Sequence, residues 1–442
     1  MNTRLLFIAT LLLCGTIMIS AKPSLPSQTN RNLNTSTNEN INSNKHQASV
    51  ISKISTLKAP TINVYLENSG SMDGYVNGNT DFENAVYDYL SDLQFADLGV
   101  KSGAKNVLNL NYINSKVLKQ RPDVQEFIRA LEPKNFKIKG GDRGTSDIST
   151  IIDTILSQTG PSDVSVFISD CIFSPGKKYK KGDNADEYLK TQEISIRGHI
   201  TQKISERSNF SIVVLRLLSG FNGTYYNKFD EGQRINDKRP FYIWLMGDKV
   251  YLKKILDSID INQIEGSGVK NVYMASTMLD TIPFSISMPK PGKGSYKLNN
   301  SIEPKTISNA KVDSKGDDKK FEVSISVDFS NILLPEEYLM DEHNYDISNS
   351  AYNVEIKKYS GPNADKYTHE IKLILDKPVI SRGLITISMI NNIPQWVYEY
   401  TDEVGKDVNN AMLKTYGFKY LIKGVNDAYS IKKYGQITIN IK

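Results

Sequence analysis

The stretch Thr61–Met72, TINVYLENSGSM, decides the fold of this 442-residue chain. Its first six residues alternate and are rich in branched and aromatic side chains, which predicts a β-strand. The next six, ENSGSM, are mostly turn residues with side-chain oxygens, so the strand ends in a tight polar loop. Thr80 and Glu83 then form a capping box, and an apolar stripe at helical spacing runs from Phe82 to Leu93. The sequence therefore predicts a strand, an oxygen-rich loop and a helix in succession.

The same alternation of strands and helices continues to about residue 275. Strands are expected at 107–113, 164–169, 212–218 and 241–246, and apolar-striped helices lie between several of them. The strand at 164–169 is almost continuously apolar, which is typical of a strand covered on both faces. Residues 60–275 are therefore predicted to form an α/β domain with a doubly wound, mostly parallel, Rossmann-like sheet.

The pattern changes after residue 275. Pro283, Pro289, Pro291 and Gly292 mark a boundary, and alternating apolar runs follow between 321 and 441. Alternation of this kind is typical of antiparallel strands with one face in water. One helix is expected at about 403–422. Residues 276–442 are thus predicted to form a β-rich, sandwich-like second domain with one helix.

The N-terminal residues 1–21 have the pattern of a secretory signal peptide. Arg4 precedes the apolar run Leu5–Leu13, and Ser20-Ala21 offers small residues for cleavage. The run is shorter than the ~20 residues of a spanning helix. An uncleaved anchor is the alternative, and it would confine membrane association to this end. Cys14 suggests a lipoprotein signal, but the bulky leucine before it fits lipidation badly.

Residues 22–59 are predicted to be a disordered tether, because they are rich in Asn, Ser and Thr and almost free of aromatics. The formal charge of +5 belongs to this end: the first 60 residues carry six basic groups and one acid. The rest of the chain is balanced, so the charge gives no argument for a nucleic-acid partner. Two cysteines exclude a disulfide scaffold, and four histidines leave little for a multi-histidine zinc site.

Three oxygen-rich loops lie at the ends of predicted strands, where open α/β sheets bind ligands. They are Glu67–Met72, Gly144–Asp147 and Ser169-Asp170. Hard divalent cations such as Mg²⁺ take hydroxyl and carboxylate oxygens. The candidate metal ligands are Glu67, Ser69, Ser71, Thr145 and Asp170.

With these residues, the region 60–260 resembles a von Willebrand factor type A domain with a metal-ion-dependent adhesion site, of an exported bacterial type. The family has Asp-x-Ser-x-Ser after its first strand, a Thr in a later loop and an Asp after its fourth strand. Here Glu67 stands in place of the first Asp, so this carboxylate reaches one methylene further. It would bind the cation directly, shift it, or leave the site weak. Three aspartates of the same loops are available to compensate: Asp73, Asp142 and Asp147.

The resemblance implies an exported binding protein, not an enzyme, located in the periplasm, at the cell surface or in the medium. It would mediate protein–protein or adhesive interactions, with an acidic group of the partner completing the coordination of Mg²⁺, Mn²⁺ or Ca²⁺. A lysine run, 177–181, is either a solvated loop or a positive rim for such a partner. One alternative is a metal-free assembly component of the cell envelope. The other is a metal-dependent hydrolase, for which these loops offer no good general base.

Overall fold

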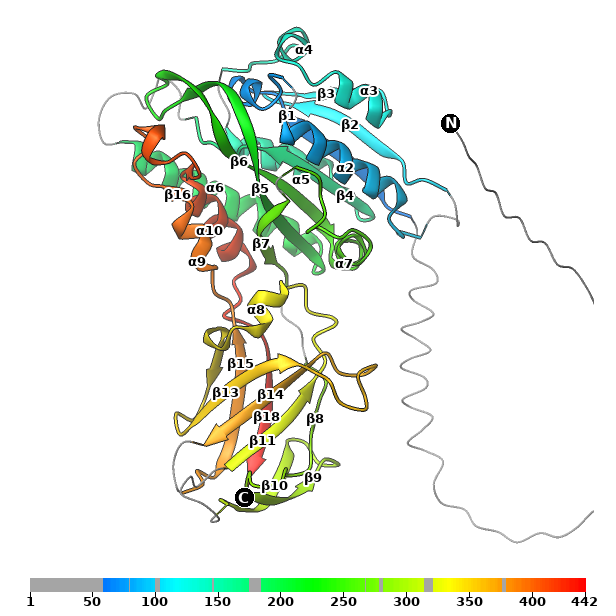
Figure 1. Cartoon of the computed structure of the whole chain (residues 1–442), viewed down its shortest axis with the longest axis vertical. Helices are drawn as coiled ribbons and strands as arrows, with labels where there is room; N and C mark the ends of the chain where they lie inside the picture. Colours follow the sequence, from blue (N-terminus) through cyan, green and yellow to red (C-terminus); the bar gives the residue numbers. More distant parts are fainter. Residues whose placement is uncertain are drawn as a thin grey trace, which may run out of the picture. The chain divides into compact units, whose positions relative to one another are not determined.

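The structure, a computed structural model, describes most of the chain after the predicted tether (Figure 1). The described ranges are 59–78, 80–99, 104–144, 147–174, 184–266, 268–277, 281–313, 321–375 and 379–442. They belong to one compact unit. The predicted signal peptide and all but the last residue of the predicted tether lie outside them. Within these ranges no helix is both long and apolar enough to cross a membrane.

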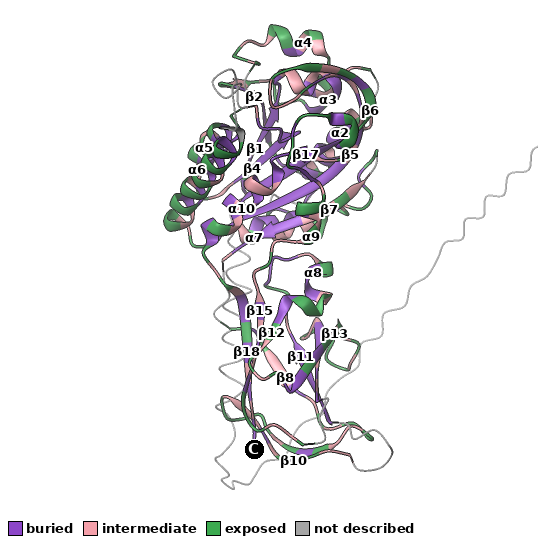
Figure 2. Cartoon of the chain, turned by 90° about the vertical axis from the view of Figure 1, so that its left-hand side faces the viewer, coloured by how far each residue is buried: buried purple, intermediate pink, exposed green. Residues whose placement is uncertain are grey.

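A seven-stranded sheet forms the centre of the first part of the chain, and its strands are mostly buried (Figure 2). The strands lie side by side in the order β3-β2-β1-β4-β6-β5-β7. β1 pairs in parallel with both β2 and β4, whereas the other four pairings are antiparallel. The strands are β1 (Thr61–Glu67), β2 (Leu108–Ile113), β3 (Val117–Lys119), β4 (Asp163–Ser169), β5 (Phe210–Tyr226), β6 (Gly232–Asp248) and β7 (Val269–Ala275).

The prediction of an α/β fold is confirmed, but the prediction of a mostly parallel sheet is wrong. β5 and β6 are 17 residues each and join through the short turn 227–231, so they form a long hairpin. A chain that reverses without a crossover helix must pair antiparallel. The apolar cores at 212–218 and 241–246 were expected as separate strands. Beyond Leu217 the burial of β5 only alternates, which hid the hairpin from the sequence analysis.

Helices cover both faces of this sheet (Figure 1). They are α2 (Asp81–Phe95), α3 (Val124–Arg129), α4 (Pro133–Ile138), α5 (Ile148–Gln158), α6 (Asn184–Glu206) and α7 (Lys249–Ser258), with the 3₁₀ turn η1 at Gly70–Gly74. On one face, α5 and α6 form a shared core with Phe167 and Trp244 of the sheet. The predicted capping box of α2 does not form, because the Thr80 hydroxyl donates instead to the Tyr75 carbonyl, at 2.5 Å.

The second part of the chain is β-rich, as predicted. Its two sheets have the orders β12-β15-β18-β10-β9 and β13-β14-β11-β8. Tyr296 of β9 lies 5.9 Å from Phe321 of β11, between ring centroids, so the two sheets touch there. The elements are β8 (Phe284–Ile286), β9 (Ser295–Asn299), β10 (Lys305–Lys311), β11 (Phe321–Val327), α8 (Glu336–Met340), η3 (Glu342–Asn344), β12 (Tyr345–Ile347), β13 (Tyr352–Lys358), β14 (His369–Leu375), β15 (Gly383–Ile390) and β18 (Lys433–Ile441).

One strand departs from the expected half-wet pattern, because every residue of β11 is buried. Its polar face includes Glu322, which Lys293 covers with an ion pair of 2.9 Å. Glu370 on the neighbouring β14 is paired in the same way with Lys290 and Lys357, at 3.0 and 2.7 Å. Long lysine side chains therefore shield this face of the sheet.

Between β15 and β18 the chain returns to the α/β part. This excursion holds α9 (Gln395–Glu399), β16 (Thr401–Asp402), η4 (Val408–Asn410), β17 (Thr415–Tyr416) and α10 (Phe418–Tyr429). α10 packs along α6, and the Phe418 ring stacks on Tyr242 of β6 at 4.4 Å (Figure 1). The helix expected at 403–422 thus begins later, after Gly417, whose φ of 75° is left-handed. Its apolar residues nevertheless recur at helical spacing: Phe418, Leu421, Ile422, Val425, Ala428 and Tyr429.

Candidate functional site

The loop after β1 is a tight turn built on two serines. Glu67 ends the strand, and η1 begins three residues later. The Ser69 and Ser71 hydroxyl oxygens lie 2.9 Å apart, and Ser69 is 2% exposed. The backbone N–H of Gly70 donates to the Arg143 carbonyl at 2.9 Å. This bond fastens the turn to the loop that precedes α5.

The loop after β4 brings a second carboxylate to the same edge of the sheet. β1 and β4 are adjacent and parallel, so Glu67 and Ser169 reach the carboxyl ends of their strands together. The Ser169 hydroxyl donates to Glu67 Oε2 at 2.5 Å. Asp170 follows directly, and its Oδ1 accepts the N–H of Ile172 at 3.1 Å. Both carboxyl side chains are buried, with exposed fractions of 0% for Glu67 and 1% for Asp170.

Burial and like charge disfavour the ionised form of Asp170. Desolvation raises its pKa most, and the charge of Glu67 raises it further. Asp170 Oδ2 is buried and has no hydrogen-bond partner among the described residues. The Ser71 hydroxyl lies near enough to lower the pKa, but not in hydrogen-bond geometry to Oδ2. A buried carboxylate oxygen without a donor is costly, so a proton or a cation would stabilise this pair.

Four of the five predicted ligands therefore lie in the loops at one edge of the sheet: Glu67, Ser69, Ser71 and Asp170. Thr145 lies outside the described residues. Within the described ranges, no group of three or more His, Cys, Asp or Glu side chains gathers as a metal site. The predicted ligand set is not a group of this kind, because it consists of two carboxylates and three hydroxyls.

The three aspartates that were expected to compensate for Glu67 have local partners. Asp73 forms an ion pair with Arg143. Asp142 accepts the N–H of Gly144 at 2.8 Å. Asp147 caps α5 by accepting the N–H of Thr150 at 3.1 Å. Their bonds shape the loops around the two carboxylates.

Arg143 braces the serine turn, a role that the sequence did not predict. Its Nε donates to the Asn68 carbonyl at 2.6 Å, and its Nη2 donates to the Ser69 carbonyl at 3.1 Å. The same guanidinium pairs with Asp73. One arginine thus holds both ends of the turn from the facing loop. Its position within the Gly-Gly-Asp-Arg-Gly loop was the only available signal.

Arg239 of β6 places a buried positive charge near the carboxylates. It is 1% exposed, and its charge lowers the pKa of Asp170. Its Nη1 donates to the carbonyls of Ala411 and Met412, at 3.1 and 3.0 Å. Its Nε and Nη2 have no hydrogen-bond partner within the described ranges. Arg239 was not predicted, because it reaches the site only through the unexpected hairpin.

A cleft of ≈ 790 Å³ opens above the serine turn. One wall is the tip of the β5–β6 hairpin, which the excursion holds: the Lys228 N–H donates to the Gly405 carbonyl at 2.9 Å. Lys137 and Arg143 give the cleft positive groups. The lysine run 177–181 lies outside the described residues. The lining comprises Ser69, Gly70, Ser71, Asp73, Lys137, Asp142, Arg143, Gly144, Ile172, Phe173, Ser174, Tyr226, Asn227 and Asp230.

Comparison of the chain with protein-family models, with curated proteins and with solved structures gives no match.

Proposed function

We propose that this chain is an exported binding protein whose α/β part is a variant von Willebrand factor type A domain. A divalent cation held by Glu67 and Asp170 would complete its coordination with a carboxylate of a partner protein. The observation that carries this proposal is the buried pair of carboxyl groups, in which Asp170 Oδ2 has no hydrogen-bond partner among the described residues.

The arrangement of the strands supports this assignment in part. β2, β1 and β4 are neighbouring parallel strands, and the loops after β1 and β4 carry Glu67, Ser69, Ser71 and Asp170. Parallel strands place their carboxyl ends at one edge, where α/β folds bind ligands. The antiparallel β6 beside β4 departs from the expected sheet but leaves this edge intact.

The donor set fits a hard cation. Glu67 and Asp170 offer carboxylate oxygens, Ser69 and Ser71 offer hydroxyls, and Thr145 would add a third hydroxyl. Mg²⁺ and Mn²⁺ prefer oxygen ligands. The bound cation would supply positive charge that offsets the repulsion between the carboxylates and attracts an incoming acidic group.

The surrounding residues are suited to receiving a protein segment. Arg143 fixes the serine turn through two backbone carbonyls, so the hydroxyls are held in place before binding. Lys137 is exposed on the rim of the cleft and attracts negative charge. Phe173 and Tyr226 line the same cleft and offer apolar contact. A partner with an exposed Asp or Glu beside an apolar residue matches this lining.

The second candidate function is that of a metal-free assembly component of the cell envelope, and the position of Arg239 supports it. Its buried guanidinium already lowers the pKa of Asp170, so part of the negative charge is balanced without a cation. In that role the cleft would bind its partner equally well in the presence of a chelator.

The two candidates differ in a peptide-capture experiment with the full chain. A bead-displayed peptide library, in which each member carries one Asp or the matching Asn, is probed with labelled protein in Mn²⁺ and in EDTA. The cation-dependent function predicts selection of Asp-containing beads in Mn²⁺ alone, with loss of binding in Asp170→Asn. Asp237→Asn, an exposed position outside the lining of the cleft, is the matched control and should bind as the wild type. Selection that survives EDTA and Asp170→Asn contradicts the cation-dependent function.

A further inference from the structure

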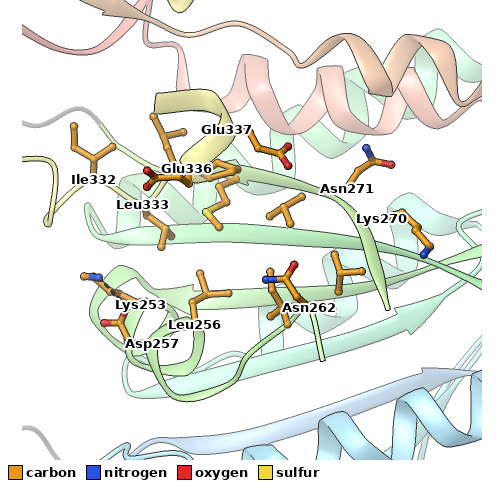
Figure 3. A pocket seen from close by; sticks show the side chains of 16 residues that line it. Lys253, Leu256, Asp257, Asn262, Lys270, Asn271, Ile332, Leu333, Glu336 and Glu337 are labelled. Atoms are coloured by element: carbon orange, nitrogen blue, oxygen red, sulfur yellow. Dashed lines mark hydrogen bonds and ion pairs between the residues drawn. The ribbon is translucent and has the colours of Figure 1, made fainter. Parts of the chain in front are cut away.

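A second concave site lies along β7, away from the carboxylate pair. It is a groove of ≈ 460 Å³ between β7, α7 and the segment Ile332–Glu337 (Figure 3). β7 is an edge strand of the seven-stranded sheet, and among the described residues it pairs only with β5. Edge strands present backbone donors and acceptors that can pair with another chain.

The open backbone groups of β7 can be identified. The Met274 carbonyl accepts the Tyr434 hydroxyl at 3.5 Å, so this carbonyl points away from β5. Along an antiparallel strand the backbone N–H and C=O groups of successive residues point to alternate sides. The backbone groups of Val272, two residues before Met274, therefore also point away from β5. Val272 lies opposite Leu215 of β5. Among the described residues, no backbone bond from another segment reaches Val272. Its N–H and C=O face the groove.

The groove also offers apolar contacts on one side. Met274 and Val272 of β7, Leu256 of α7 and Leu333 of the facing segment line it. Side chains of a strand alternate between two faces, so every second residue of an added strand would meet these apolar groups. Lys270–Met274 spans five residues of β7, or about 14 Å between its end Cα atoms at ~3.4 Å per step. The groove therefore suits a short extended segment.

Charged side chains give the groove a direction. Lys270 lies at one end and Glu337 toward the other (Figure 3). Glu336, beside Glu337, already forms an ion pair with Lys358 at 3.3 Å. Lys253 and Asp257 neutralise each other on the α7 side, at 3.0 Å. β7 runs from Lys270 to Met274, so an antiparallel partner would end near Lys270.

We propose that the β7 groove binds an extended peptide segment of a partner protein, which adds to the sheet as an antiparallel strand. The segment would alternate apolar and polar residues, with a basic residue at its N-terminal end and an acidic residue at its C-terminal end. Backbone bonds to Val272 would supply affinity, and the alternating apolar side chains would supply specificity and register. This site is separate from the cation site and does not depend on it.

The test uses a labelled peptide, acetyl-Lys-Val-Thr-Val-Thr-Val-Glu-amide, and the full chain, with affinity measured by fluorescence anisotropy. The same peptide N-methylated at its fourth and fifth residues keeps its side chains but loses the one of these two backbone donors that faces β7. A lost backbone bond costs about 1 kcal/mol, so we expect a Kd that is weaker by about fivefold or more. Equal affinity of the two peptides, or no saturable binding of either at roughly 1 mM, overturns the proposal.

Val272→Pro tests the same contact from the protein. Proline is accepted on edge strands where the N–H points outward, so this variant should keep the wild-type melting temperature. Its peptide affinity should fall by about fivefold or more, whereas the matched control Val272→Thr should bind within about twofold of wild type. If Val272→Pro unfolds, the N-methylated peptide decides.

Peptide polarity and self-association give two further outcomes. Exchange of the terminal Lys and Glu should weaken binding, because like charges then meet at both ends of the groove. A dimer in sedimentation analysis that Val272→Pro abolishes would instead assign the edge to a second copy of this chain and overturn the peptide proposal.

Discussion

Asp170→Asn should stabilise the chelated protein, although it removes a buried group. The amide keeps an oxygen to accept the Ile172 N–H, now 3.1 Å from Asp170 Oδ1. Its nitrogen replaces Oδ2, which has no hydrogen-bond partner among the described residues. It also ends the repulsion with Glu67, one cause of the raised pKa of Asp170. Asparagine carries no charge, so the cost of burying a carboxylate beside Glu67 is removed, and we expect a gain of about 1–3 kcal/mol in EDTA.

The assay is urea unfolding at pH 8 in EDTA, followed by the fluorescence of the buried Trp244. Asp402→Asn is the matched control, because Asp402 is also buried but accepts two backbone N–H groups, at 2.9 and 3.0 Å. This control should destabilise the protein modestly, because the amide oxygen keeps both bonds but loses the negative charge that strengthens them. In saturating Mg²⁺ the order should reverse, and Asp170→Asn should become less stable than wild type. If Asp170→Asn destabilises the chelated protein as much as Asp402→Asn, the account of the pair is wrong.

Three further predictions concern other parts of the chain. Burial opposes the ionised form of Glu370, but bonds from Lys357 and Lys290 outweigh it and lower its pKa to about 2. The stability gained is complete above the unfolded pKa of 4.5 and is lost as pH falls through about 2. In Glu370→Gln the free energy of unfolding should therefore depend less on pH between about 4.5 and 2. Gly417→Ala should destabilise the protein by at least about 1 kcal/mol in urea titrations, because φ is 75° and the new Cβ would lie 2.6 Å from a leucine of α6. If residues 1–21 are a signal peptide, mass spectrometry of the protein from its source cells should find Lys22 at the N-terminus, whereas an intact Met1 would contradict cleavage.

Local sequence signals predicted the strands and loops that carry the candidate site. The turn after Glu67 and the end of β4 at Ser169 lie where the alternation of strand and loop residues placed them. This part was predictable because strand ends and turns depend on neighbouring residues. The α/β class followed from the same signals.

The rest of the site depends on contacts between distant segments. Arg239 approaches Asp170 only because β5 turns directly into β6, and no apolar pattern distinguishes this hairpin from two separate strands. The bond from Arg239 to Ala411 spans 172 residues of sequence. The predicted helix at about 403–422 began too early, because it included polar residues before Gly417. The apolar residues that recur at helical spacing begin only at Phe418, where α10 begins. Long-range pairing of this kind leaves no local signal.

Calorimetric titration of Mn²⁺ into the chelator-treated full chain tests the central claim most directly. The account predicts one saturable ion per chain, lost in Glu67→Gln and in Asp170→Asn and kept in Asp237→Asn. Absence of saturable binding, or binding that both carboxyl variants retain, would contradict a cation at the buried carboxylate pair.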